Sequence, residues 1–436
     1  MNNFVAVVRM FVGLPLEVYG WDLIVVLRGD KMRSKRYWIF GAILFLSAGC
    51  YGEGMKNRTF GEDVEFLKKH TDVFTLSDET GESQVAIVPA YQGRIMTSTA
   101  EGPVGLSFGW LNYELISSGE IQKHINVFGG EDRIWFGPEG GQYSIFFSAG
   151  EPFDLEHWYT PAVIDTEPFE SFCKEKDSAT FEKRTKLTNR SGFVFEIEIE
   201  RTIRLLDRGQ IEGYLGAEVP EGVKVVGYQS ENTLKNAGSE AWRKETGLLS
   251  IWILGMFNPS EGTTIVIPFE EGPEEQLGAK VNDTYFGKVP AERLIVKDDV
   301  LFFSGDGKCR SKIGLSPQRA KAIMGSYDSS NNVLTLVQYS KPEGVSDYVN
   351  SLWEMQDEPY GGDAVNSYND GPPAPGKKPL GPFYELESSS PAAGLKAGEG
   401  ITHIHRTIHL QGPECLLGEV SVKTLGVSLE EVKAAL

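Results

Sequence analysis

An alternation of apolar and acidic residues between Phe193 and Leu205 constrains the fold most strongly. Phenylalanine or isoleucine occupies almost every second position, and Glu196, Glu198 and Glu200 fall between them. This period of two predicts a β-strand with one face toward a hydrophobic core and the other toward water. Further short apolar runs, several without polar alternation, are typical of strands buried between layered sheets. These runs are residues 248–256, 263–269, 294–303 and 333–339.

Helical patterns are few, and none alternates regularly with the strands. A short helix is expected near residues 61–70, and another at 429–436, where Ser428 and Glu431 have the spacing of a capping box. No repeat of fixed period is present. We therefore expect an all-β chain, a large and mostly antiparallel β-sandwich, in one domain over residues 61–436.

The N-terminal segment has the layout of a secretory signal. A basic stretch at 32–36 precedes the apolar run Tyr37–Leu46, and small residues lead to Cys50. The small triplet before Cys50 resembles a bacterial lipobox, although Ser47 stands where leucine is more common. We expect residues 1–31 to be an over-extended start, 32–49 a lipoprotein signal peptide and 50–60 a tether. Cleavage nearby without a lipid is the alternative. The expected location is the periplasm or the outer membrane.

The charge of the chain argues against two classes of partner. A formal net charge of −19 repels nucleic acid and anionic lipid, so contact with a membrane is expected only through a lipid on Cys50. The four cysteines are widely spaced and form no CxxC, so neither a zinc knuckle nor a disulfide framework is predicted. No sequence feature indicates an oligomeric state.

Three histidines alternate with isoleucines near the end of the chain. On a strand, His403, His405 and His409 would share one face, with neighbours two apart separated by about 7 Å. Three interpretations remain open. The histidines could bind a metal, although no HExxH accompanies them; they could act as acid, base or hydrogen-bond donor to a sugar; or they could be structural. We expect no metal or other cofactor.

A pair of carboxylates lies shortly before these histidines. Glu385 and Glu387 would share one face of a strand, where they could act as general base or hold sugar hydroxyls, or could simply be solvated. Upstream, Asn366 and Asp370 are candidates for substrate binding. Residues 367–371 also have turn composition, so Asp370 could instead shape the backbone.

A glycine-rich cluster at residues 126–143 is the second candidate region. Arg133, Trp135 and Glu139 could stack on and hydrogen-bond a polar ring, and His157 lies near further aromatic residues. The cluster lacks GxxxxGK and opens no helix, so it is not a phosphate loop.

Four motifs occur in order along the chain, namely GGEDRIWFGPEGGQYS, GDAVNSYNDGPP, FYELESSSPA and THIHRTIH. Together they resemble a family of uncharacterised secreted bacterial proteins associated with the galactose mutarotase-like superfamily, and the resemblance spans roughly Phe60 to Gly412. It implies a supersandwich whose concave face binds carbohydrate, with Glu385 or Glu387 as the general base of an aldose epimerase or mutarotase. The superfamily's mid-chain Asn-His pair is absent, so His403 or His405 would supply the acid. The alternative function is a non-catalytic glycan-binding module or scaffold.

Overall fold

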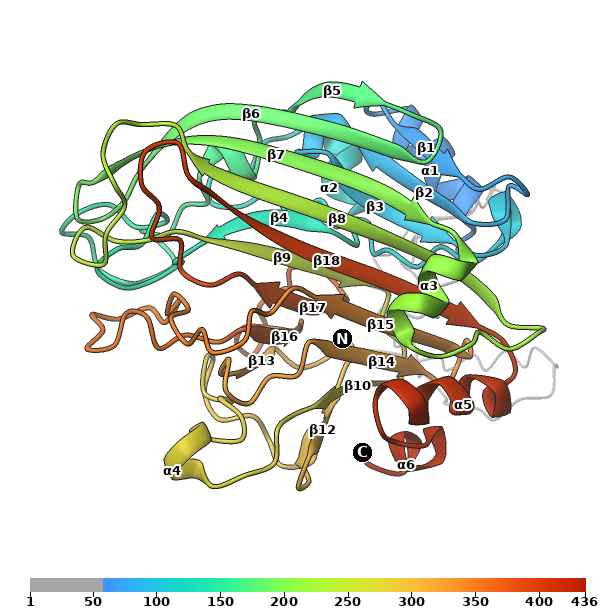
Figure 1. Cartoon of the computed structure of the whole chain (residues 1–436). Helices are drawn as coiled ribbons and strands as arrows, with labels where there is room; N and C mark the ends of the chain where they lie inside the picture. Colours follow the sequence, from blue (N-terminus) through green and yellow to red (C-terminus); the bar gives the residue numbers. More distant parts are fainter. Residues whose placement is uncertain (1–57) are drawn as a thin grey trace, which may run out of the picture. The chain divides into compact units, whose positions relative to one another are not determined.

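The computed structural model describes residues 58–436 (Figure 1). The predicted signal peptide and Cys50, the predicted site of lipidation, lie outside this range. The strands form three antiparallel sheets, and the expected all-β, antiparallel architecture is confirmed. No helix in the described part of the chain is long and apolar enough to cross a membrane.

The largest sheet has ten strands, which cross the front of Figure 1. In spatial order they are β11 (Leu294–Val296), β12 (Val300–Ser304), β10 (Thr263–Pro268), β14 (Ile323–Asp328), β15 (Val333–Tyr339), β18 (Gly400–Gln411), β8 (Lys224–Asn236), β7 (Val194–Leu206), β6 (Ser178–Thr188) and β5 (Glu170–Lys174).

Two smaller sheets complete the β-structure. The five-stranded sheet has the order β13 (Ser311–Leu315), β16 (Val365–Asn369), β17 (Tyr384–Ser389), β9 (Ser250–Phe257) and β4 (Arg133–Gly137). The three-stranded sheet contains β1 (Phe74–Ser77), β2 (Gln84–Val88) and β3 (Arg94–Thr99). An isolated bridge between Ile95 and Asp132 joins it to the chain just before β4.

The main core lies between the ten-stranded and five-stranded sheets. The predicted alternation in β7 is confirmed, because Phe195, Ile197 and Ile199 are fully buried while Glu196 and Glu200 are exposed. Apolar side chains of β8, β9 and β4 complete this part of the core. The opposite half is filled by residues of β10, β12 and β15 that face β13, β16 and β17. Two layers of sheet thus bury each other's apolar faces.

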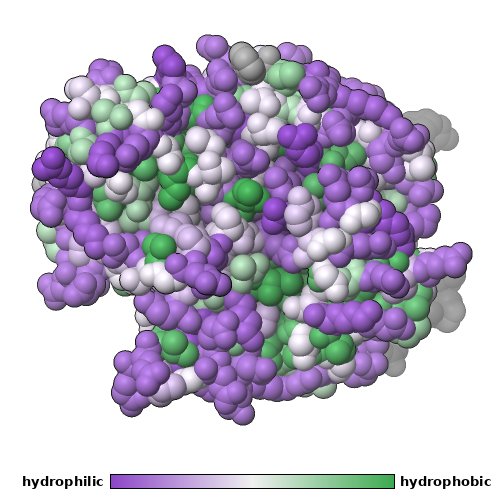
Figure 2. Space-filling model, in the orientation of Figure 1, coloured by the Kyte–Doolittle hydropathy of each residue, from purple (hydrophilic) through white to green (hydrophobic). Residues whose placement is uncertain are grey.

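Helices cover part of the outer face of the large sheet. The helices are α1 (Phe60–Lys68), α2 (Tyr113–Ser118), α3 (Arg208–Leu215), α4 (Glu274–Leu277), α5 (Glu414–Thr424) and α6 (Leu429–Lys433). Residues of α3, α5 and α6 bury Leu334, Ile408 and Leu410 of the sheet. In the same orientation, Figure 2 shows a largely hydrophilic surface with scattered hydrophobic residues.

Two local predictions differ from the structure. The apolar run at 294–303 forms two strands, β11 and β12, because Asp298 and Asp299 interrupt it with a turn. The segment predicted as a turn at 367–371 instead lies largely in β16, where Ser367 and Asn369 are buried and pair with β17. Tertiary pairing there outweighs the local turn preference.

Candidate functional site

The strand register of the five-stranded sheet gathers charged side chains on one face. Lys312 of β13 is opposite Tyr368 of β16, which is opposite Glu385 of β17. In the next row, Glu387 is opposite Leu254 of β9, and Leu254 is opposite Arg133 of β4. Side chains in register across a sheet share a face. The sheet therefore brings the predicted residues Arg133, Glu385 and Glu387 together.

Both glutamates form buried ion pairs. Arg133 Nη2 lies 3.0 Å from Glu385 Oε1, and Lys312 Nζ lies 2.8 Å from Glu387 Oε2. The Trp252 indole N–H donates to Glu387 at 3.0 Å. Each cation also lies over an aromatic ring, since Arg133 Cζ is 4.4 Å from the centroid of Trp135 and Lys312 Nζ is 4.6 Å from that of Trp252. The predicted shared face of the two glutamates is confirmed.

The protonation of Glu385 is set by its surroundings. Burial raises the pKa of Glu385 to about 8, the Arg133 guanidinium opposes this shift, and the Glu387 carboxylate adds to it. A carboxyl group with such a pKa exchanges its proton near neutral pH, which suits a general acid or base.

Two adjoining cavities lie over this face of the sheet. One, of about 320 Å³, is lined by Arg133, Trp135, Glu385 and residues of the loops between strands. The other, of about 330 Å³, is lined by Asp363, Asn366, Ser250 and neighbouring side chains. Their linings share Glu139, Leu155, Trp252, Phe286, Arg310, Lys312 and Trp353. The two cavities therefore form the lobes of one groove.

Aromatic side chains dominate the walls of this groove. Trp135, Trp158, Trp252 and Trp353 line it, which is half of the eight tryptophans in the chain. Leu155, Phe286 and Leu380 stand at its edge with about half of their surface exposed. Apolar ring faces above a charged floor can hold a ligand with both apolar faces and polar edges.

A family model describes nearly the whole structure. The model of a family of unknown function, DUF6786, matches residues 58–436. The chain belongs to the DUF6786 family. Membership confirms the resemblance of the sequence motifs to an uncharacterised family. No curated protein matches this chain in sequence.

Solved structures similar to this DUF6786 chain include three proteins of low sequence identity. Slr1438 from Synechocystis shares 14% identity at a TM-score of 0.45, with 79% of this chain and 96% of that protein covered. A galactose mutarotase-like protein from Lactobacillus casei shares 13% at 0.42, covering 78% and 100%. An aldose epimerase homologue from C. elegans shares 10% at 0.41, also covering 78% and 100%. Likeness at this level establishes no shared activity.

The predicted binding residues of the DUF6786 chain fall into two groups. Arg133, Trp135 and Asp370 line the first lobe, Asn366 lines the second, and Glu139 lines both. His157 is not among the lining residues. Its Nδ1 lies 2.7 Å from Asp154 and its Nε2 lies 3.2 Å from Glu151 on a surface loop. The hydrogen bond with Asp154 raises the pKa of His157.

The three histidines of β18 lie apart from the groove. They share one face of the strand, but that face is turned inward, and His403 and His405 are fully buried between the two sheets. The Ser388 hydroxyl lies 2.8 Å from both His403 Nε2 and His405 Nδ1. Ser388 stands on β17 with the opposite alternation to Glu385 and Glu387, so the strand separates the imidazoles from the carboxylates.

The environment of these histidines is that of structural groups. Burial lowers the pKa of His403 to about 3 and that of His405 to about 4. His409 contacts Thr335 at 2.9 Å and Glu131 at 3.0 Å. No group of three or more His, Cys, Asp or Glu residues arranged for a metal occurs within residues 58–436.

One histidine that the sequence did not single out lines the groove. His124 Nδ1 lies 2.7 Å from the carbonyl oxygen of Trp158. Because a carbonyl only accepts, Nδ1 donates in this contact, which leaves Nε2 directed away from the Trp158 carbonyl. Lys312, Trp252, Trp353 and Arg310 were also not predicted. Of these four residues, only Lys312 could have been recognised from the sequence, because a charged residue stands out among its mostly apolar neighbours in β13.

Proposed function

We propose that this protein binds a carbohydrate in the two-lobed groove above the five-stranded sheet. The observation that carries the proposal is the floor of the groove, where the buried Arg133–Glu385 pair lies beside Trp135 and Trp252. The C–H faces of a sugar ring can pack on indole rings, and its hydroxyl groups can bond to the guanidinium and carboxyl. The glutamates of β17 face the groove and the histidines of β18 do not, so they cannot act together on one sugar. This separation favours a non-catalytic glycan-binding module.

A second candidate function is anomer interconversion, as in an aldose epimerase. Glu385 favours it, because burial holds the pKa of Glu385 near 8 beside a groove that also contains His124. Glu385, when ionised, would take the proton from the anomeric hydroxyl while the bond from C1 to the ring oxygen breaks. The ring oxygen would take a proton from Nε2 of His124 in its protonated form, and the aldehyde would then rotate about the C1–C2 bond. The reverse steps would close the ring, with the ring hydroxyl returning its proton to His124 and Glu385 returning its proton to the anomeric oxygen. His403 and His405, which the sequence favoured as the acid, have no part in this proposal.

Glycan-array binding followed by NMR exchange spectroscopy of the bound sugar's anomers tests both functions. We expect binding by the wild type and a loss of at least about tenfold for Arg133→Ala, because the variant removes the floor cation. Glu274→Gln, on the exposed helix α4, is the matched surface control. Binding without faster anomer exchange would leave the binding module alone. Absence of binding to any glycan would contradict the proposal.

We further propose export as a lipoprotein, supported by the basic, apolar and small residues before Cys50. Mass spectrometry of the membrane fraction should find a diacylglyceryl group on Cys50 and none in Cys50→Ser. An unmodified N-terminal peptide containing Cys50 in that fraction would contradict the proposal.

A further inference from the structure

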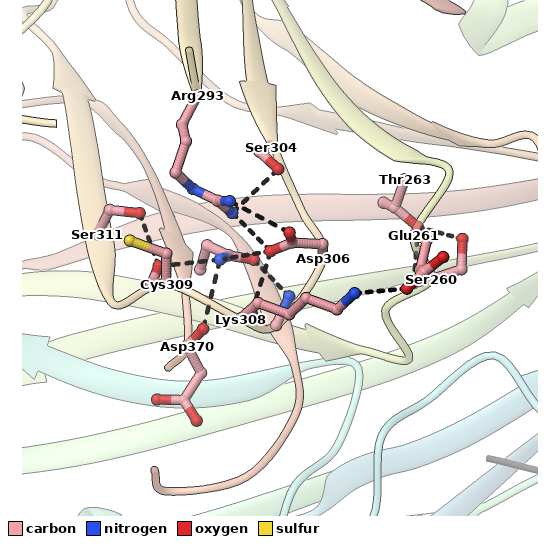
Figure 3. Close-up of polar contacts among 12 residues, drawn as sticks. Ser260, Glu261, Thr263, Arg293, Ser304, Asp306, Lys308, Cys309, Ser311 and Asp370 are labelled. Atoms are coloured by element: carbon pink, nitrogen blue, oxygen red, sulfur yellow. Dashed lines mark hydrogen bonds and ion pairs between the residues drawn. The ribbon is translucent and has the colours of Figure 1, made fainter. Parts of the chain in front are cut away.

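The turn between β12 and β13 is fixed by a dense polar network (Figure 3). The Asp306 carboxylate accepts hydrogen bonds from Arg293 Nη1 at 3.2 Å, from Asn369 Nδ2 at 3.2 Å and from the backbone N–H of Lys308 at 3.0 Å. The Asn369 amide also donates to the carbonyl of Cys309 at 3.0 Å and accepts from Gly307 N at 2.8 Å. Residues 305–310 are therefore held in one conformation against β16.

Two cationic side chains of this turn, Lys308 and Arg310, point in different directions. Lys308 Nζ reaches outward to Glu261 at 2.6 Å, and both side chains are exposed. Arg310 lines both lobes of the groove, with Cζ 3.8 Å from the centroid of Phe286 and the guanidinium close to Tyr368. Across residues 58–436, Arg310 forms no ion pair within 4.0 Å. Burial raises the pKa of the Asp370 carboxyl and the Arg310 charge opposes this rise, but the two groups form no ion pair, so the guanidinium is available to a ligand.

The other cations of the groove floor already have carboxyl partners. Arg133 donates a hydrogen bond to the Glu385 carboxyl, and Lys312 pairs with Glu387. Arg310 thus differs from them in position and in pairing. A guanidinium stacked on an aromatic ring keeps its edge N–H groups for a planar anion, which it can bind through two parallel hydrogen bonds.

We propose that Arg310 selects a sugar that carries an anionic group, a carboxylate as in a uronic acid or a sulfate ester. This inference rests on the proposed carbohydrate binding and specifies the class of ligand. The anionic group would lie where the two lobes meet, in contact with Arg310.

Ionised carboxyl groups around Arg310 would repel an anionic ligand, and raised pKa values of these groups weaken this repulsion. Burial raises the pKa of Asp370 and of Glu139, and it raises that of Asp363 to about 6. Together with Glu385, these acids are shifted toward their neutral forms, whereas the hydrogen bond with His157 lowers the pKa of Asp154, which also lines the second lobe. The groove therefore carries less negative charge than it would if all its acids were ionised. The formal net charge of the whole chain is −19.

Matched sugar pairs test this inference by isothermal titration calorimetry. The probes are galactose with galacturonic acid and with a sulfated galactose, and glucose with glucuronic acid. We expect the wild type to bind at least one acidic sugar about tenfold or more tightly than its neutral counterpart. Raising the salt concentration should weaken only the acidic sugar's binding. The carboxylate and sulfate arms distinguish the two sources of charge.

Two neighbouring substitutions separate Arg310 from a general effect of charge. Arg310→Gln should reduce the ratio of acidic to neutral affinity to about twofold or less, whatever its effect on neutral binding, whereas Lys308→Gln should keep the full ratio. Arg310→Lys retains the charge and should fall between them; it also serves as the test if Arg310→Gln does not fold. Equal wild-type affinity for neutral and acidic sugars, or equal losses in both glutamine variants, would overturn the inference and leave carbohydrate binding intact. If none of the sugars bound, carbohydrate binding and this inference would fail together.

Discussion

Replacing Glu385 with glutamine should stabilise the protein at neutral pH relative to acidic pH. In the folded protein, burial holds the pKa of this carboxyl at about 8, whereas the ordinary value is 4.5. Between these values the folded protein keeps a proton that the unfolded chain has lost. The wild type therefore loses stability from this group as the pH rises through the interval. Glutamine has nearly the same shape, stays neutral and abolishes this dependence.

The size of the effect follows from the pKa difference. Each pH unit in the interval corresponds to about 1.4 kcal/mol of unfolding free energy. The difference in unfolding free energy, Glu385→Gln minus wild type, should therefore grow by about 3 kcal/mol from pH 4.5 to pH 7. It should become constant above pH 8. The glutamine oxygen can still accept from Arg133, so the contact with this guanidinium is not lost completely.

Urea unfolding of both proteins at half-unit pH steps measures this difference. Glu387→Gln, two residues away on the same face, is the matched control. It leaves the buried Lys312 ammonium without its carboxylate, so it should destabilise the protein by about 3 kcal/mol at pH 7. Parallel curves for wild type and Glu385→Gln across pH 4.5–8 would refute the reasoning, because Glu385 would then titrate alike in the folded and unfolded states.

Three further outcomes are expected. Ser388→Ala should lower the unfolding free energy by about 2 kcal/mol, because it leaves two buried imidazole nitrogens without a partner. Sugar affinity measured by calorimetry should not change. A loss of affinity in this variant would indicate that the β18 histidines contribute to sugar binding. His405→Gln should lessen the loss of stability as the pH falls from 6.5 to about 4, because burial lowers the pKa of His405 and only the unfolded chain is protonated there; an unchanged acid profile in urea would contradict this. A disaccharide should bind about tenfold more tightly than its monosaccharide, because two cavities of similar volume adjoin; equal affinities in calorimetry would indicate that only one lobe is used.

The fold class could be read from the sequence because strand periodicity is a local signal. The alternation at Phe195, Ile197 and Ile199 and the apolar run of β15 both correspond to strands in the structure. The shared face of Glu385 and Glu387 also followed from periodicity alone. The turn within residues 294–303 was missed because two adjacent aspartates are a weak signal for a turn in a mostly apolar run.

The composition of the site depended on information that periodicity does not contain. Alternation placed His403 and His405 on one face of β18, but whether that face meets solvent or another sheet depends on tertiary packing. Lys312 and Trp252 come from strands distant in sequence, and only the order β13-β16-β17-β9 brings them to Glu387. Arg310 required the three-dimensional network around Asp306. Pairwise register and loop conformation are therefore what the sequence could not supply.

Every residue of β17 is buried, from Tyr384 to Ser389. Its carboxylates form the floor of the groove, and its alternate side chains, Leu386 and Ser388 among them, hold the second sheet. A substitution in this strand therefore alters the ligand site and the core at once, and few replacements satisfy both. Phe286, Arg310 and Leu380 lie on loops, and their side chains line the groove without packing in the core between the sheets. Changes of ligand preference among related chains should consequently accumulate in these loops, above a floor that stays the same.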